Sequence, residues 1–276
     1  MSDDASGLGP LPGPGELHAR FARQYPLDWG DPLPTVGQIA AEFGAPAASR
    51  SLELLRRAAE HHGEATGQVL AAIPPGGTTY QLDRRVKSPS SLARKLWKYG
   101  RKNRPALTDD VLRFTVLASG PEALVGLAVA TTDRLAARGW RVESAVHTYV
   151  DGSRYKGLHA IMRSTGDHQV EIQFHSPESA RVKAATTELY LIERDPRRSK
   201  QARQSARRDC IALSATVTQP PGIDQLTELG GVPVRVRNYG TAVRAPQGVG
   251  APQPASEGAG SKHPGRPGIE KDGMTR

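Results

Sequence analysis

The chain has one cysteine, Cys210, so it cannot form an internal disulfide, and a reducing compartment suits it. It also lacks a long apolar run: the longest, around Ala123–Ala130, is much shorter than a membrane span. Its first residues, MSDDASGLG, are acidic and no apolar segment follows them, which predicts that there is no signal peptide. These absences lead us to expect a cytoplasmic protein with no membrane partner.

Two glycine-rich motifs that bind nucleotides, GxxxxGK(S/T) and GxGxxG, are missing as well. Any phosphate group would therefore have to be held by side chains. The central histidines are His147, His159, His168 and His175. None of them has a helical partner four residues away or a CxxC pair nearby, so we expect no zinc site.

Both ends of the chain are rich in Gly and Pro and poor in large apolar side chains. Such segments cannot bury enough surface to offset the entropy lost on ordering. The composition predicts a disordered tail over 1–30, a helical extension over 31–75, a central folded domain over 76–215 and a mostly disordered extension over 216–276.

The net charge of +9 is concentrated in two segments. Between Arg84 and Arg104 there are nine Lys or Arg residues and no acid, and between Arg181 and Arg208 there are nine more against three acids. Either segment alone is compatible with a solvated helix face. Because the two segments flank a polar strand, they favour a polyanionic partner such as a nucleotide, pyrophosphate or nucleic acid.

Hydrophobic periodicity and turn residues predict a β-α-β-α-β-β-β-α order that follows two N-terminal helices. Strands are expected over 78–87, 111–117, 140–150, 157–163 and 169–175. Helices are expected over 35–43, 51–73, 88–99, 121–138 and 177–194, with another basic helix after Pro196. This order predicts an α+β fold in which a mixed five-stranded sheet is flanked by helices.

Three of the predicted strands alternate between an apolar and a polar face, as in HQVEIQFHS over 168–176. Their polar faces together carry Arg113, His159, Glu171, Gln173 and His175. Solvent exposure alone explains simple alternation, but this collection of chemical groups favours a functional surface. Asp110 lies two residues before the apolar Leu112, so a regular strand would place both side chains on the apolar face. Asp110 therefore has to lie where its strand begins or bends.

Carboxylates and lysines near the first basic segment are candidates for binding a metal and phosphates. Asp109, Asp110 and Glu171 suit magnesium, which takes one or two carboxylates together with substrate phosphates, although TDD is also a common turn. The phosphate candidates are Arg85, Lys87, Lys95 and Lys98, at a strand end that leads into a basic helix. Tyr155, in DGSRYKG, is either a turn residue or a platform on which a base stacks.

Four segments in series resemble the synthetase domain of the RelA/SpoT family: RVKSPSSLARK, DDVLRFTV, YKGLH and VEIQFHS. The resemblance covers about residues 78–195. It implies a nucleotidyltransferase-like fold and the transfer of pyrophosphate from ATP to the 3′-hydroxyl of a nucleotide, with Mg²⁺ as cofactor.

The resemblance also implies a role for each matching residue. Arg85, Lys87, Ser91 and Lys95 would hold ATP, with Arg113 in place of a family arginine that is Thr115 here. Asp110 and Glu171 would bind magnesium, and Glu171 would also assist the acceptor hydroxyl beside Gln173. Tyr155 would stack on the acceptor base, with His159, His175 and Lys183 beside the acceptor.

The chain departs from the family pattern in two places. The Asn-Gly that the family has before its tyrosine is Ser153 and Arg154 here, which leaves guanine selectivity open. The ending FHSPES, followed by a helix with Lys183, Tyr190 and Arg194 on one stripe, resembles the toxin-type small synthetases. The chain has no room for the family's hydrolase domain, so we expect synthesis without hydrolysis.

Three functions are therefore open. The first is an ATP-dependent pyrophosphokinase that acts on a purine nucleotide, GDP or GTP by family expectation. The second is a toxin-type enzyme that makes adenosine alarmones or pyrophosphorylates the 3′ end of tRNA, with a possible antitoxin. The third is a non-catalytic module that binds nucleotide or RNA, against which the intact Asp110 and Glu171 argue.

Overall fold

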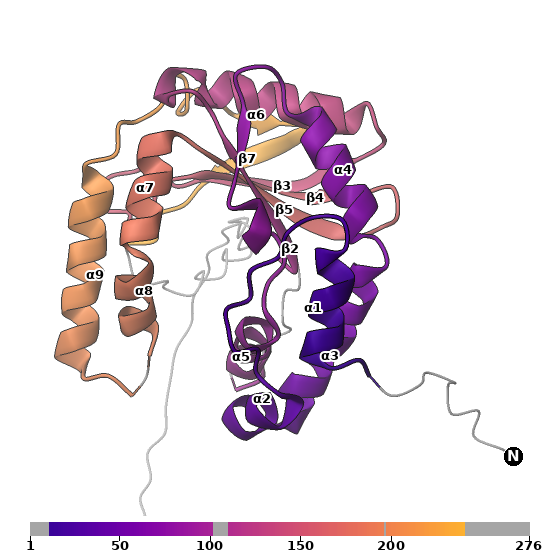
Figure 1. Ribbon diagram of the computed structural model, residues 1–276. Helices are drawn as coiled ribbons and strands as arrows, with labels where there is room; N and C mark the ends of the chain where they lie inside the picture. The colour runs from indigo at the N-terminus through magenta and orange to yellow at the C-terminus, as the bar shows by residue number, and fades with distance from the viewer. Residues whose placement is uncertain (1–10, 102–109, 196, 241–276) are drawn as a thin grey trace, which may run out of the picture. The chain divides into compact units, whose positions relative to one another are not determined.

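The computed structural model describes residues 11–101, 110–195 and 197–240 (Figure 1). The described residues contain a seven-stranded sheet in the order β1-β2-β5-β4-β3-β7-β6. Its strands are β1 Thr78–Tyr80, β2 Leu112–Leu117, β3 Arg141–His147, β4 Leu158–Arg163, β5 Gln169–His175, β6 Glu228–Leu229 and β7 Val232–Val236. The β2–β5 and β3–β7 pairs are parallel and the other pairs are antiparallel, so the predicted α+β fold with a mixed sheet is confirmed.

Nine α-helices and one short 3₁₀ helix accompany the sheet in the described part of the chain. They are α1 Pro14–Ala22, α2 Val36–Phe43, α3 Ala45–Ala59, α4 His62–Ala72, η1 Leu82–Arg84, α5 Pro89–Gly100, α6 Pro121–Ala136, α7 Pro177–Ala185, α8 Thr187–Arg194 and α9 Lys200–Ala215. No helix in these residues has both the length and the apolar character needed to cross a membrane.

The sheet has seven strands because the segment predicted to be mostly disordered, 216–276, supplies two of them. β7 pairs in parallel with β3, and Leu229 of β6 is buried in the core. Gly230 connects the two strands with φ +57, and a Cβ there would lie 2.4 Å from a methyl carbon of Val142. The prediction overlooked these two short strands and their glycine turn because they precede a Gly/Pro-rich segment. Residues 241–276 of that segment lie outside the described residues.

The N-terminal prediction is wrong for residues 14–22, which form α1 within the segment expected to be disordered. Gly13 and Pro14 begin this helix rather than prevent one, as proline commonly does at the first helical position. Leu17 and Phe21, four residues apart on one helix face, are completely buried. Residues 1–10 lie outside the described residues.

We predict that Leu17→Ala lowers the free energy of unfolding by about 2–5 kcal/mol, the usual cost of truncating a buried leucine. Leu11→Ala serves as the control, because Leu11 is 40% exposed and should change stability very little. Urea unfolding of both variants checks this. Equal stability of the two variants would mean that α1 does not pack on the core.

Three predicted elements are divided in the structure. The helix expected over 51–73 belongs to α3 and α4, and the helix expected over 177–194 is α7 and α8. The second break lies at Thr186, whose hydroxyl donates to the carbonyl of Val182, a local bond that competes with regular helix. The strand expected over 78–87 ends at Tyr80, because η1 follows it.

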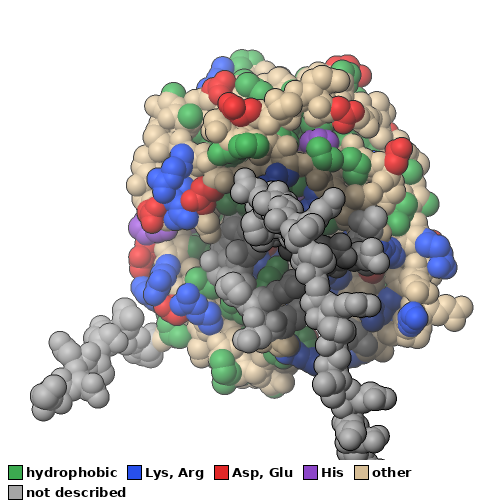
Figure 2. All heavy atoms as spheres, turned by 180° about the vertical axis from the view of Figure 1, so that it is seen from behind, with side chains coloured by type: hydrophobic (Ala, Val, Ile, Leu, Met, Phe, Trp, Pro, Cys, Tyr) green, Lys and Arg blue, Asp and Glu red, His purple; other side chains and the backbone are tan. Residues whose placement is uncertain are grey.

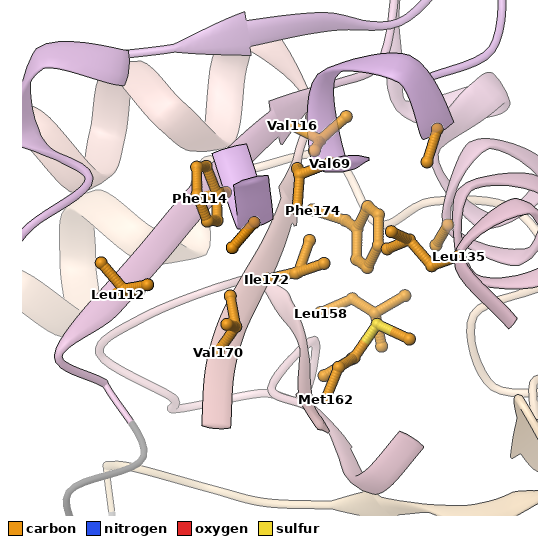
Figure 3. Close-up of a cluster of buried hydrophobic side chains, with 14 of the residues drawn as sticks. Val69, Leu112, Phe114, Val116, Leu135, Leu158, Met162, Val170, Ile172 and Phe174 are labelled. Carbon is orange, nitrogen blue, oxygen red and sulfur yellow. The ribbon is translucent and has the colours of Figure 1, made fainter. Parts of the chain in front are cut away.

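The apolar faces of β2, β4 and β5 form the centre of the core (Figure 3). Phe114, Ile172 and Phe174 alternate with the polar residues of their strands and are buried. Val69 of α4 and Leu135 of α6 pack against them. Since these helices seal the apolar face, the polar alternates are directed to the opposite face of the sheet.

Candidate active site

Strand register brings the predicted polar residues together on one face of the sheet. In the parallel pair β2–β5, Arg113 is opposite Glu171 and Thr115 is opposite Gln173. In the antiparallel pair β4–β5, His159 is opposite Gln173. The three strands therefore place a guanidinium, a carboxylate, an amide and an imidazole side by side.

Glu171 is the centre of this group. Its Oε1 accepts a hydrogen bond from Nδ1 of His159 at 2.9 Å and one from Nε2 of Gln173 at 3.0 Å. Burial alone would raise the pKa of Glu171, but His159, followed by Arg113 and Gln173, lowers it well below its ordinary value. Its Oε2 accepts no hydrogen bond from the described residues, so Glu171 presents an ionised and open oxygen.

Lys183 reaches this group from α7. Its Nζ donates to Oε1 of Gln173 at 2.5 Å, so the amide of Gln173 links Lys183 to Glu171. Burial and the nearby charge of Arg113 lower the pKa of Lys183 to about 7, despite the opposing effect of Glu171. Lys183 therefore changes charge near neutral pH.

We predict that the affinity for a phosphate-bearing acceptor falls about 10-fold between pH 6 and pH 8, because Lys183 loses its positive charge over this range. Lys183→Arg should remove this dependence, since arginine stays charged. The acceptor KM at pH 6, 7 and 8 for both proteins is the measurement. The variant also corrects for titration of the acceptor itself. Parallel pH profiles for the two proteins would show that Lys183 does not contact the acceptor.

Tyr155 is anchored rather than isolated in its loop. Its hydroxyl lies 2.7 Å from Nε2 of His175, which is completely buried. Its ring contacts His159 edge-on, with the ring centroids 5.1 Å apart, and Tyr239 at 6.4 Å. Among the predicted acceptor residues, Tyr155 thus contacts both His159 and His175.

A second group, of charged side chains, forms where β2 begins, which is where Asp110 was predicted to lie. Oδ1 of Asp110 accepts from Nζ of Lys95 at 2.7 Å, and Oδ2 accepts from Nζ of Lys87. Burial alone would raise the pKa of Asp110, but Lys87 and Lys95 lower it below its ordinary value. Burial also lowers the pKa of Lys87, although Asp110 opposes this.

Helix α5 presents Lys95 to this group. Ser88 caps the helix, accepting from the backbone N–H of Ser91 at 3.3 Å, and Pro89 is its first residue, both as predicted. Ser91 lies in the first turn and Lys98 in the last. The remaining candidate, Asp109, lies outside the described residues.

Arg85 does not belong to either group. Its side chain is completely buried, and its guanidinium donates to the carbonyl oxygens of Phe21 and Tyr25, at 2.9 and 3.2 Å, and also to those of Pro26 and Leu82. It therefore holds the segment after α1 in place. Because the guanidinium of Arg85 already binds four carbonyl oxygens of the chain, Arg85 is not one of the residues proposed to hold ATP.

Sequence reasoning missed Ser179 and Tyr239. Ser179 accepts from or donates to His175 at 2.9 Å and forms a capping box with Ser176 at the start of α7. The SPES segment has a serine three residues before another polar residue, and this spacing is typical of a capping box. The guanidinium carbon of Arg237 lies over the ring of Tyr239, 4.8 Å from the ring centroid, in a segment predicted to be mostly disordered.

Acidic side chains pair with part of the positive charge in the second basic segment. On the face shown in Figure 2, Lys and Arg side chains lie in several groups, some with acidic side chains beside them. In the second segment, Asp195 pairs with Arg197 at 2.9 Å and with Arg198 at 3.9 Å. Arg154 pairs with Glu193 at 2.6 Å, which joins the Tyr155 loop to α8.

No family model and no curated protein matches the chain. Among solved structures, it is similar to the type VI effector Tas1 in complex with its immunity protein, with 21% identity over 62% of this chain and 93% of that chain, at a TM-score of 0.35. It is also similar to the small alarmone synthetase 1 from Bacillus subtilis bound to its product pppGpp, with 16% identity over 63% of this chain and 91% of that chain, at a TM-score of 0.34.

Proposed function

We propose that the protein is an ATP-dependent pyrophosphokinase that transfers the β,γ-pyrophosphate of ATP to the 3′-hydroxyl of a purine nucleotide and releases AMP. One observation carries the proposal. Glu171 presents an ionised, open oxygen on a sheet face between Arg113 and the Tyr155–His175 pair. The four motifs that resemble the RelA/SpoT synthetase domain supply these residues in the order of that family.

The donor ATP would lie on the side of β2 and α5. Lys87, Lys95 and Arg113 offer positive charge, and the first turn of α5 at Ser91 offers backbone N–H groups. The side chain of Arg113 forms no hydrogen bond or ion pair with the described residues, although its charge acts on both Lys87 and Glu171. It is therefore the cation best placed to bridge the two groups through a phosphate.

Magnesium fits the carboxylates that are present. The described residues contain no group of three or more His, Cys, Asp or Glu side chains placed to hold a metal ion, but magnesium needs only one or two carboxylates with phosphates and waters. Glu171 offers its open oxygen, and Asp110 can take part once a phosphate draws Lys87 or Lys95 away. When bound, the ion would neutralise charge on the phosphates.

The acceptor would lie over Tyr155, with its phosphates near Lys183 and its 3′-hydroxyl near Oε2 of Glu171. The hydroxyl oxygen attacks the β-phosphorus, the bond from that phosphorus to the oxygen shared with AMP breaks, and Glu171 accepts the hydroxyl proton. Such transfers need little covalent help from the protein, because positioning and charge neutralisation dominate. The well-lowered pKa of Glu171 keeps the carboxylate charged for the hydroxyl to donate to.

The acceptor class is decided by a direct assay. Purified protein is incubated with ATP and magnesium, and separately with GDP, GTP, adenine nucleotides or tRNA, while AMP is measured. The proposal expects AMP only when an acceptor is present. AMP release with adenine nucleotides or tRNA alone would favour the toxin-type alternative, and binding of ATP without release in any mixture would favour a non-catalytic module.

We predict that Tyr155→Ala reduces acceptor kcat/KM by about five- to 100-fold, the value of one lost base stack at roughly 1–3 kcal/mol. The KM for ATP should stay unchanged, because ATP lies beside Lys87 and Lys95. Tyr155→Phe keeps the ring and loses the bond to His175, so its effect should be smaller. Unchanged acceptor kinetics in Tyr155→Ala would remove the acceptor from this loop.

A further inference from the structure

Three side chains form a hydrogen-bonded chain at the end of β5. The hydroxyl of Tyr155 lies 2.7 Å from Nε2 of His175, and Nδ1 of His175 lies 2.9 Å from Oγ of Ser179. His175 and Ser179 are 0% and 1% exposed, so water cannot replace the bond between them. Each buried donor and acceptor therefore has to be matched within the chain.

The hydrogens of this group can be assigned one by one. Oγ of Ser179 accepts from the backbone N–H of Ser176 at 3.0 Å and donates its single hydrogen to the carbonyl oxygen of Ser176 at 3.2 Å. A lone pair of that Oγ then faces His175, so Nδ1 of His175 carries the ring hydrogen. Nε2 is left as an acceptor, which suits the hydroxyl of Tyr155 as a donor.

The opposite tautomer leaves a hydrogen without a partner. If Nε2 of His175 carried the hydrogen and donated it to Tyr155, the hydroxyl hydrogen of Tyr155 would have no acceptor among the described residues. A donor without an acceptor in this partly buried contact is unfavourable. The hydroxyl of Tyr149 also donates towards Oγ of Ser179, but at 3.5 Å this is the longest contact of the group. The Nδ1–H tautomer is therefore the one that satisfies all the contacts of 3.2 Å or shorter in this group.

Two further features are built around this chain of bonds. Gly157 leaves the space that the contact needs, because a Cβ there would lie 2.6 Å from the hydroxyl of Tyr155 and 2.9 Å from Cε1 of His175. The capping box of α7 fixes Ser179, since Ser176 and Ser179 bond to each other's backbone N–H groups. The loop, the strand and the helix thus meet at His175.

We propose that Ser179 is a positioning residue that fixes His175 as the Nδ1–H tautomer, and that His175 in turn holds the ring of Tyr155 in the orientation that receives the acceptor base. The role assigned to the ring rests on the proposed function, whereas the tautomer does not. Because the hydroxyl hydrogen of Tyr155 is committed to His175, the acceptor base is recognised by the face of the ring and not by a hydrogen bond that this hydroxyl donates.

Ser179→Ala tests this with Ser176→Ala as its matched control. Each variant loses one hydrogen bond of the capping box, but only Ser179→Ala leaves Nδ1 of His175 without its partner. We expect Ser179→Ala to raise the acceptor KM about five- to 100-fold, the range for a lost base stack, with the KM for ATP unchanged. Ser176→Ala should leave both values near those of the wild type. Equal effects of the two variants on the acceptor KM would overturn the positioning role.

Nitrogen NMR of the histidine side chains tests the tautomer without any turnover. The signal of His175 is identified by its absence in His175→Gln. The wild-type chain should show Nδ1 protonated and Nε2 unprotonated, and Ser179→Ala should lose this pattern while Ser176→Ala keeps it. A wild-type His175 protonated at Nε2 would overturn the proposal. If the wild type releases no AMP with any acceptor, the proposed function fails, and the NMR result still decides whether Ser179 sets the tautomer.

Discussion

Glu171→Gln should reduce acceptor-dependent AMP release by about 10²–10⁴-fold, the usual loss when a general base is removed. The substitution keeps the shape of the side chain, and its amide oxygen can still accept from His159 and Gln173, so the fold should be preserved. What it removes is the negative charge and the proton acceptor at Oε2. Steady-state AMP release at saturating ATP and acceptor, with a melting curve of the same sample, measures the effect.

Glu143→Gln is the matched control for this variant. Glu143 lies in β3 of the same sheet, but its carboxylate pairs with Arg163 and Gln169, away from the candidate site. It should lose some stability and little turnover. If a folded Glu171→Gln protein releases AMP at nearly the wild-type rate, the assignment of Glu171 has to be abandoned.

Asp110→Asn should reduce turnover by about 10²–10³-fold, a loss typical of removing one stabilising group from a charged transition state. Asp110 is the shared counter-charge of Lys87 and Lys95, so its loss removes the carboxylate that both ammonium groups contact. Breaking a fully buried pair costs about 3–5 kcal/mol. The cost should be smaller here, because the side chain of Asp110 is 17% exposed. AMP release, its dependence on magnesium concentration and urea unfolding check both effects.

Two comparisons separate chemistry from stability in this variant. Asp28→Asn removes an exposed pair with Arg84 and should change neither turnover nor stability appreciably. The double variant Asp110→Asn with Lys87→Met also removes one of the two neighbouring lysine charges, so their repulsion falls and stability should recover in part while turnover stays low. Wild-type turnover and magnesium dependence in Asp110→Asn would mean that Asp110 only tethers the lysines.

The sheet face could be predicted because alternation in a strand has a fixed period. Glu171 and Gln173 alternate with Ile172 and Phe174, so one face of β5 had to be apolar and the other polar. The start of α5 was predictable for a similar reason, since Ser88 followed by Pro89 is a local helix signal. Patterns of this kind depend only on neighbouring residues.

Contacts between distant residues could not be read in this way. Arg85 belongs to a basic motif, yet its partners are the carbonyl oxygens of a segment about sixty residues earlier, and α1 was hidden by the Gly/Pro content around it. The bond between Tyr155 and His175 joins a loop to a strand end, 20 residues apart. β7 was missed because its five residues gain their stability from pairing with β3. In each of these cases, contacts between residues that are distant in the sequence determine the structure, and local composition does not show those contacts.

The most direct test of the proposed reaction follows the β-phosphate of ATP. Wild-type protein is incubated with magnesium, ATP labelled in the β-phosphate and an acceptor that supports AMP release. Pyrophosphate transfer predicts that the label moves to the 3′ position of the acceptor in an amount equal to the AMP formed. Label that stays in ADP, while only the γ-phosphate reaches the acceptor, would contradict it.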